Sequence, residues 1–122
     1  MQRAALVVDD DEAVRVVACG LLGSLGFEVL TAADGVEAVE VFRLNQARIA
    51  VVLLDVTMPR LDGIGALREL RRIRPEVRVI LCTGYCEEEA RTRLGDLASE
   101  ELLEKPFDLD RLRERLGAVL TD

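Results

Sequence analysis

The chain has 122 residues, half of them apolar, so we expect one domain whose core buries roughly two thirds of the surface that the unfolded chain exposes. Its net charge of −7 argues against a nucleic-acid or anionic-membrane surface, because both need clustered positive charge. Histidine is absent, which excludes any mechanism that relies on an imidazole base or ligand. The only lysine among the cationic residues is Lys105.

Cysteine usage predicts a reducing compartment. We expect Cys19, Cys82 and Cys86 to be reduced and mostly buried thiols. A metal site would need closer ligand spacing, and Cys86 has no base partner that would make it a nucleophile. No stretch approaches the roughly 20 apolar residues of a membrane span, and the first residues lack a signal-peptide pattern. We therefore expect a cytoplasmic protein that makes no membrane contact.

Short apolar runs alternate with amphipathic runs along the whole chain. The helical spacing ends at Gly26 for the first amphipathic run and before Pro75 for the third, and Asp108 is the expected N-cap of the last. In chain order the pattern predicts strand 4–8, helix 12–25, strand 27–31, helix 35–47, strand 49–54, helix 64–73, strand 77–82, helix 87–97, strand 101–103 and helix 109–120.

Five such strand–helix units predict an α/β fold, with a parallel sheet covered by helices on both faces. Ligands of open α/β sheets bind outside the carboxyl ends of the strands, near the topological switch point. Only Thr31 and two alanines follow the second strand, so we expect that corner to lie outside the site. The polar residues at the other strand ends are the functional candidates: Asp9, Asp10, Asp11, Asp55, Thr83 and Lys105.

Carboxylates gathered at one sheet edge repel one another, and a divalent cation removes this conflict. Mg²⁺ takes an octahedron of oxygen ligands and keeps several waters. Asp10 and Asp55 can supply two ligands, with a nearby backbone carbonyl as a third. So few protein ligands leave room for an oxygen-rich partner such as a phosphoryl group.

Asp55 follows the most apolar strand, so a rigid element fixes its carboxylate. A carboxylate can attack phosphorus and form an aspartyl phosphate. The developing charge then needs a cation, an ammonium group and a hydroxyl donor, and Lys105 and Thr83 supply the last two. Gly84 beside Thr83 leaves space for the phosphoryl group.

Each candidate also has a purely structural interpretation. The acidic run 9–12 could cap a helix and complement its dipole, and Asp55 could cap a turn. Thr83 could be an ordinary turn residue, and Lys105 a solvated loop charge. Their shared position at one predicted edge favours a common site.

Four segments together resemble the response-regulator receiver domain over the whole chain. They are Leu6-Val7-Val8-Asp9-Asp10-Asp11-Glu12, the stretch from Leu53 to Gly63 that reads Leu-Leu-Asp-Val-Thr-Met-Pro-Arg-Leu-Asp-Gly, Thr83-Gly84, and Lys105-Pro106-Phe107. The resemblance implies one receiver domain over 1–122 with a flavodoxin-like, doubly wound sheet in the order 2-1-3-4-5 and five helices. Residues 83–89 and 105–109 also resemble receivers of hybrid histidine kinases, so we expect a stand-alone regulator or a part of a longer kinase.

The resemblance also implies a role for each site residue. Asp55 would accept a phosphoryl group from a phosphohistidine of a histidine kinase or a histidine phosphotransfer domain. Asp9, Asp10 and Asp55 would hold Mg²⁺ together with the backbone carbonyl of Thr57. Thr83, Gly84 and Lys105 would contact the phosphoryl group, and the Lys105–Pro106 bond is often cis in the family.

One position departs from the family pattern. Receivers usually carry Tyr or Phe three residues before the lysine, and Leu102 stands there. The switch residues of the family would therefore be Thr83 and Leu102, with Tyr85 as a candidate for part of the missing aromatic role. Phosphorylation would switch the face formed by the fourth helix, the fifth strand and the fifth helix.

Two other functions fit parts of the sequence. A receiver-like binding module that switches without phosphorylation finds its support in Leu102. An aspartate-based phosphatase would need a second acid two residues after Asp55, where Thr57 stands, so no general acid is present. Flavin binding is disfavoured by the acidic loop after the first strand. We expect a phosphoacceptor that is not an enzyme in the ordinary sense, binds no nucleic acid and is a monomer.

Overall fold

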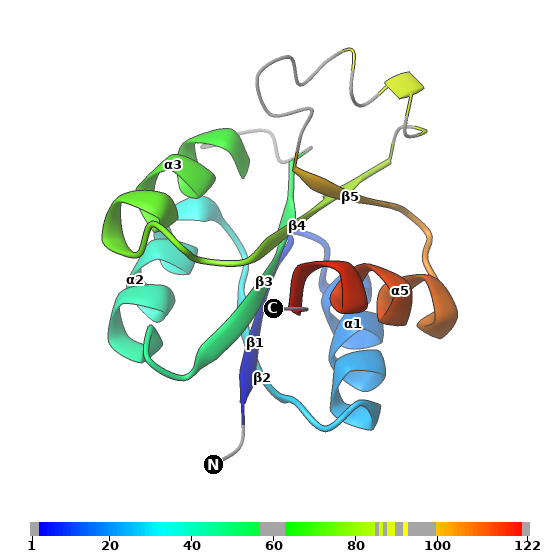
Figure 1. Ribbon diagram of the computed structural model, residues 1–122, viewed down its shortest axis with the longest axis horizontal. Helices are drawn as coiled ribbons and strands as arrows, with labels where there is room; N and C mark the ends of the chain where they lie inside the picture. Colours follow the sequence, from blue (N-terminus) through cyan, green and yellow to red (C-terminus); the bar gives the residue numbers. More distant parts are fainter. Residues whose placement is uncertain are drawn as a thin grey trace.

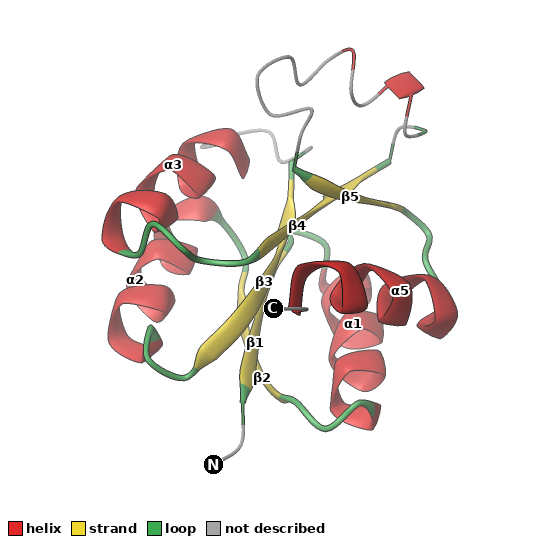
Figure 2. Cartoon of the chain, in the orientation of Figure 1, coloured by secondary structure: helices red, strands yellow, loops and turns green. Residues whose placement is uncertain are grey.

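The computed structural model describes residues 3–56, 63–84, 86, 88–89, 92 and 100–120. Strands and helices alternate along these residues, as Figures 1 and 2 show. In chain order the elements are β1 (Ala4–Val8), α1 (Glu12–Ser24), β2 (Glu28–Ala32), α2 (Gly35–Asn45), β3 (Ile49–Asp55), α3 (Gly63–Ile73), β4 (Val79–Thr83), β5 (Glu101–Glu104) and α5 (Leu109–Leu120).

The strands form one parallel sheet in the order β2-β1-β3-β4-β5, which confirms the expected topology. β1, β3 and β4 occupy the centre and are almost entirely buried, as their unbroken apolar runs predict for strands covered on both faces. The chain reverses its direction of winding between β1 and β3. The topological switch point therefore lies between the carboxyl ends of these two strands.

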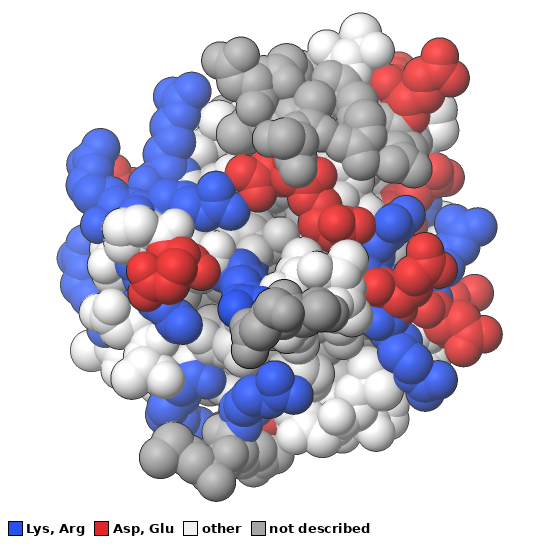
Figure 3. Space-filling view, in the orientation of Figure 1, with Lys and Arg blue, Asp and Glu red and all other residues white. Residues whose placement is uncertain are grey.

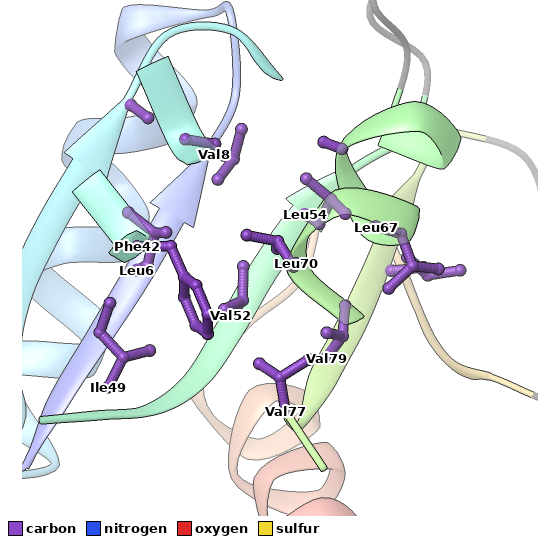
Figure 4. Packing of buried hydrophobic residues seen from close by; sticks show 14 of the residues in the cluster. Leu6, Val8, Phe42, Ile49, Val52, Leu54, Leu67, Leu70, Val77 and Val79 are labelled. Carbon is purple, nitrogen blue, oxygen red and sulfur yellow. The ribbon is translucent and has the colours of Figure 1, made fainter. Parts of the chain in front are cut away.

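Helices cover both faces of the sheet. α2 and α3 lie on one face, and α1 and α5 lie on the other (Figure 1). Alternate residues of each strand enter opposite layers, so Leu6 and Val8 pack with Phe42 of α2 on the first face, as Figure 4 shows. Ala5 and Val7 pack against α1 and α5 on the second face. Two apolar layers thus clamp the strands and fix the positions of their ends.

Aspartates begin three of the helices. The Asp11 carboxylate accepts the Ala13 N–H at 2.9 Å, and the Asp34 carboxylate accepts the Glu37 N–H at 2.8 Å. Asp108 accepts the Arg111 N–H at 2.9 Å, as expected for the last helix. Asp11 thus has the capping role that the acidic run allowed.

Two strands begin later than predicted, and four strands end one residue later. The Phe27 N–H donates back to the Leu22 carbonyl at the end of α1, so β2 begins one residue later. Gly26 makes this reversal with a φ of 94°, a conformation that favours glycine. The Val77 N–H donates to the Arg74 carbonyl in a turn, and β4 therefore begins at Val79. Both residues are buried and apolar, which is why their pattern resembles that of a strand.

Four of the five predicted helices are present among the described residues. The remaining one, predicted over 87–97, falls mainly on residues that the structure does not describe, although Glu88, Glu89 and Thr92 are helical. In the described part of the chain, no helix has the length and apolarity needed to cross a membrane.

The three cysteines are free, but the expectation that they are mostly buried is wrong for Cys86. Cys82 is buried, Cys19 is half-buried and Cys86 is exposed, because Cys86 lies beyond the end of β4 rather than within an element. Burial raises the pKa of the Cys82 thiol to about 12. Cys82 is therefore a core residue without thiolate chemistry at neutral pH.

Charge is unevenly spread over the surface. Arginines gather over the side formed by α2 and α3 (Figure 3). The Arg71 guanidinium pairs with Glu100 at 2.9 Å, and that of Arg72 pairs with Glu69 at 2.9 Å. Neighbouring carboxylates thus offset much of the positive charge of this side.

Candidate functional site at the carboxyl edge of the sheet

Adjacent central strands bring the predicted site residues together. Asp9 follows β1 and Asp55 ends β3, so the two acids are neighbours at the switch point. Thr83 ends β4 on the other side of Asp55. Asp9 and Asp55 are each only 2% exposed, and Thr83 is fully buried. Such burial of polar groups is expensive unless partners stabilise them.

Lys105 supplies one such partner. Its Nζ lies 2.8 Å from Asp9 Oδ2 and 3.2 Å from Asp55 Oδ2, so one ammonium bridges both acids. The backbone N–H of Lys105 donates to the Thr83 carbonyl at 2.7 Å, which holds the start of this loop against β4. The interpretation of Lys105 as a solvated loop charge is therefore wrong, because its side chain turns toward the carboxylates of Asp9 and Asp55. We call this side of the sheet the acidic edge.

The shared ammonium changes the proton affinity of the groups around it. Burial raises the pKa of Asp9, and although the bonds from Lys105 and from the Asp11 N–H act against this, the pKa stays above its usual value. Burial lowers the pKa of Lys105, but the hydrogen bond to Asp9 and the charges of both acids outweigh it, so that pKa is raised. Lys105 is therefore a cation at neutral pH.

Asp10 completes an acidic cluster with Asp9 and Asp55. One carboxylate oxygen from each lies within 4.8 Å of the others, and Asp10 is the exposed member. Three carboxylates against one ammonium leave an excess of negative charge at this edge. Hard oxygen donors at this spacing fit a hard divalent cation such as Mg²⁺, which would balance that charge. The acidic pocket is thus compatible with the cofactor that the sequence predicts.

The loop that carries Asp10 is also held by a residue that the sequence analysis did not select. The Arg15 Nη1 donates to the Asp9 carbonyl at 2.6 Å, from the second turn of α1. The Asp11 N–H donates to Asp9 Oδ1 at 2.9 Å. Helical spacing places Arg15 one turn after Asp11, but this spacing alone does not distinguish it from a solvated arginine.

The remaining predicted residues take different places. An added Cβ at Gly84 would meet no atom within 4 Å, so the space beside Thr83 is open as expected. Leu102 is buried and packs in the layer of α2 and α3. The Lys105–Pro106 bond is cis. Thr57 and Tyr85, proposed as a metal ligand and a switch residue, lie outside the described residues.

A family model described as the response regulator receiver domain matches residues 5–117, which include this acidic edge. The chain belongs to this family. Its fold agrees with that of solved receivers. A chain of the CheX-CheY-BeF3-Mg²⁺ complex from Borrelia burgdorferi superposes with a TM-score of 0.87 and 29% identity, over 98% of this chain and 90% of that one. The receiver domain of the hybrid histidine kinase CckA gives a TM-score of 0.80 and 35% identity, over 97% of this chain and 99% of that one.

Curated relatives include both kinases and regulators. The chain is 39% identical over 115 residues to the sensor kinase CckA of Brucella abortus (strain 2308), which is 94% of this chain and 12% of that protein. It is also 39% identical over 115 residues to the response regulator MprA of Mycobacterium sp. (strain KMS), covering 94% of this chain and 49% of that protein. The chain thus spans about half or less of the length of these relatives.

Proposed function

We propose that this receiver is the phosphoacceptor of a two-component phosphorelay and that Asp55 receives the phosphoryl group. The proposal is carried by one observation: the Lys105 ammonium lies within hydrogen-bonding distance of Asp55 and of Asp9 at the switch point. That arrangement places a buried carboxylate nucleophile beside a fixed positive charge. The CheX-CheY structure similar to this chain holds Mg²⁺ and BeF3, and the latter resembles a phosphoryl group in shape and charge.

In the proposed reaction, one Asp55 carboxylate oxygen attacks the phosphorus of a partner's phosphohistidine. The new O–P bond forms as the P–N bond breaks, and the imidazole leaves with the electron pair and takes up a proton. Lys105 moves its hydrogen bonds to the oxygens of the incoming group, and the Thr83 hydroxyl donates to another. Asp9, Asp10 and Asp55, with the Thr57 carbonyl, would hold Mg²⁺, which would neutralise charge on the phosphoryl oxygens.

The surface beside the site fits a protein donor. A hollow of about 370 Å³ lies between α1 and the loop after β5, lined by Ala13, Val14, Val17, Lys105, Pro106 and Phe107. Val17 is 55% exposed there, which is high for a large apolar side chain next to a charged site. Because Lys105 belongs to both the hollow and the acidic edge, a partner seated in the hollow would bring its phosphohistidine close to Asp55. We propose that the hollow receives an apolar helix of that partner.

The proposed consequence of phosphorylation is a change on the face that includes β5 and α5. Thr83 ends β4 and Lys105 directly follows β5, and the Lys105 N–H donates to the Thr83 carbonyl at 2.7 Å. A shift of either side chain toward a phosphoryl group would therefore move the end of β4 and the end of β5 together.

We also propose that the protein is cytoplasmic, because its three free thiols fit a reducing compartment.

The test is to incubate the protein with Mg²⁺ and acetyl phosphate and to measure its intact mass. We expect the wild type to gain the mass of one phosphoryl group and Asp55→Asn to gain none. Asp34→Asn is a matched control, because Asp34 caps α2 and does not belong to the cluster of Asp9, Asp10 and Asp55. An equal gain in Asp55→Asn, or no gain in the wild type, would disprove the proposal.

A second experiment separates docking from chemistry. Val17→Asp places a charge in the hollow without touching the acidic residues. We expect slower phosphoryl transfer from a phosphohistidine protein and an unchanged rate from acetyl phosphate. Val36→Asp is the control, because Val36 is an exposed valine (64%) on α2, on the other face of the sheet. Equal transfer from the protein donor to wild type and Val17→Asp would show that the hollow is not the docking surface.

A further inference from the structure

The β1–α1 loop, residues 9–11, decides where Asp10 points. Asp10 is exposed, so packing does not fix its carboxylate, and its position depends on the peptide groups on either side. Four hydrogen bonds hold the backbone of the loop, and two of them, from the Asp11 N–H and to the Asp9 carbonyl, involve these flanking groups. The Asp9 N–H donates to the Ala32 carbonyl at 3.1 Å, and the Asp11 N–H donates to Asp9 Oδ1 at 2.9 Å. The Arg15 N–H donates to the Asp11 carbonyl at 3.1 Å, and its guanidinium donates to the Asp9 carbonyl at 2.6 Å.

The guanidinium bond differs from the others because it is the one whose donor is a cationic side chain. The half-buried Arg15 reaches back from α1 to the carbonyl at the end of β1, so it joins the helix to the strand across the loop. A hydrogen bond from a charged donor is about twice as strong as a neutral one. The Asp9 carbonyl belongs to the peptide unit that leads into Asp10, so this bond limits rotation at the point where the carboxylate is attached.

Because Arg15 is charged, the direction in which its removal changes the Mg²⁺ affinity shows how it acts. A fixed cation beside the acidic cluster repels Mg²⁺, so through charge alone its removal would strengthen Mg²⁺ binding. Through positioning, its removal would release the loop, raise the cost of ordering Asp10 and weaken Mg²⁺ binding. The two effects change the affinity in opposite directions.

We propose that Arg15 is a positioning residue of the divalent-cation site, acting through the Asp9 carbonyl to hold Asp10 in place. This inference rests on the proposed function in one respect, namely that Asp9, Asp10 and Asp55 bind Mg²⁺. Metal-binding residues commonly depend on partners that do not touch the ion, and loss of such a partner weakens metal affinity by about 10- to 100-fold.

The experiment measures Mg²⁺ affinity by titration calorimetry and thermal stability in EDTA, without any phosphodonor. We expect Arg15→Met to bind Mg²⁺ about tenfold more weakly. Arg15→Lys keeps the charge but loses the fork geometry, and we expect an affinity between those of the wild type and Arg15→Met.

Arg74→Met is the matched control. The Arg74 Nη1 also donates to backbone carbonyls, that of Gln46 after α2 at 2.7 Å and that of Ile49 at the start of β3 at 2.8 Å, but at the opposite edge of the sheet. We expect Arg74→Met to lose stability and to keep the wild-type Mg²⁺ affinity. Loss of affinity confined to the Arg15 variants therefore supports positioning rather than a general loosening of the fold.

Unchanged or tighter Mg²⁺ binding by Arg15→Met would overturn the inference while leaving the proposed function intact. If Arg15→Met does not fold, Arg15→Lys decides: weaker binding than the wild type supports positioning, and equal or tighter binding overturns it. A wild type that binds no Mg²⁺ would overturn the metal part of the proposed function, and this inference with it.

Discussion

Charged side chains lie at both edges of the sheet, but the two edges use them differently. At the amino edge, Arg48 pairs with Glu28, and Arg74 binds two backbone carbonyls and Glu76. Each of these two arginines has a carboxylate partner that balances its charge. At the carboxyl edge, three acids share Lys105, and two of those acids are only 2% exposed. The arginine charges of this balanced amino edge are matched by carboxylates, whereas the unbalanced carboxyl edge keeps an excess of negative charge that a further cation would offset.

The largest effect on stability should come from the cation that bridges the two buried acids of the carboxyl edge. Lys105→Met leaves Asp9 and Asp55 buried without their shared ammonium, and we expect a loss of about 3 kcal/mol in the free energy of unfolding in EDTA. Urea titrations with and without Mg²⁺ test this. Excess Mg²⁺ should restore much of the loss, because an ion that binds only the folded state stabilises it. No recovery with Mg²⁺ would mean that the edge does not accept a replacement cation.

The same pairing predicts an alkaline limit to stability. The acids raise the pKa of Lys105 above 10.5, so its contribution is complete below 10.5 and is lost as the pH rises through the folded-state value. We expect the free energy of unfolding to fall above about pH 10.5 in the wild type. Lys105→Met should show a smaller fall over this range, measured by urea titration at each pH. If the wild type and Lys105→Met lost the same free energy of unfolding over this pH range, the loss could not be assigned to Lys105.

The buried carboxylate of Asp9 should make the folded protein less stable at neutral pH. Its pKa is raised, chiefly by burial, so the folded state favours the protonated form, and its contribution to stability is lost as the pH rises from 3.8 through the folded-state value. We therefore expect Asp9→Asn to melt at a higher temperature than the wild type at pH 7. The difference in melting temperature between the two proteins should disappear below pH 3.8. Asp9→Asn should also bind Mg²⁺ more weakly than the wild type. A lower melting temperature at pH 7 would contradict this expectation.

The smallest effect should come from the balanced edge. Arg48 and Glu28 are about 40% exposed, and ion pairs of this kind contribute less than about 1 kcal/mol. We expect Arg48→Met to lose no more than this amount and to keep the Mg²⁺ affinity of the wild type. A loss as large as that of Lys105→Met would remove the contrast between the two edges.

Most of the fold could be predicted because the relevant signals are local and strong. The run from Ile49 to Leu54 is continuously apolar, which is typical of a strand covered on both faces. These residues form β3, which ends at Asp55. Asp108 caps the last helix as expected. Phe27 and Val77 were misassigned because they are buried like strand residues while their N–H groups close turns, and the apolar pattern does not record where an N–H group points.

The site could be predicted where it depends on strand ends and not where it depends on loop geometry. Parallel strands bring Asp9, Asp55 and Thr83 to one edge of the sheet, and this does not depend on the paths of the loops. The bond from Arg15 to the Asp9 carbonyl depends on the path of the loop and on a long side chain with many rotamers. Neither can be inferred from residue spacing, and the same applies to the pairing of Lys105 with both acids.

The short strand β5 links Lys105 to both layers of the core. Leu102 and Leu103 are neighbours in this strand of 4 residues, yet Leu102 packs in the layer of α2 and α3, and Leu103 packs in the layer of α1 and α5. Lys105 follows this strand directly, so a pull on its side chain is transmitted to both layers. One event at the acidic edge can thus be sensed on both sides of the sheet. Two partners bound to opposite faces could then respond to the same event without competing for one surface.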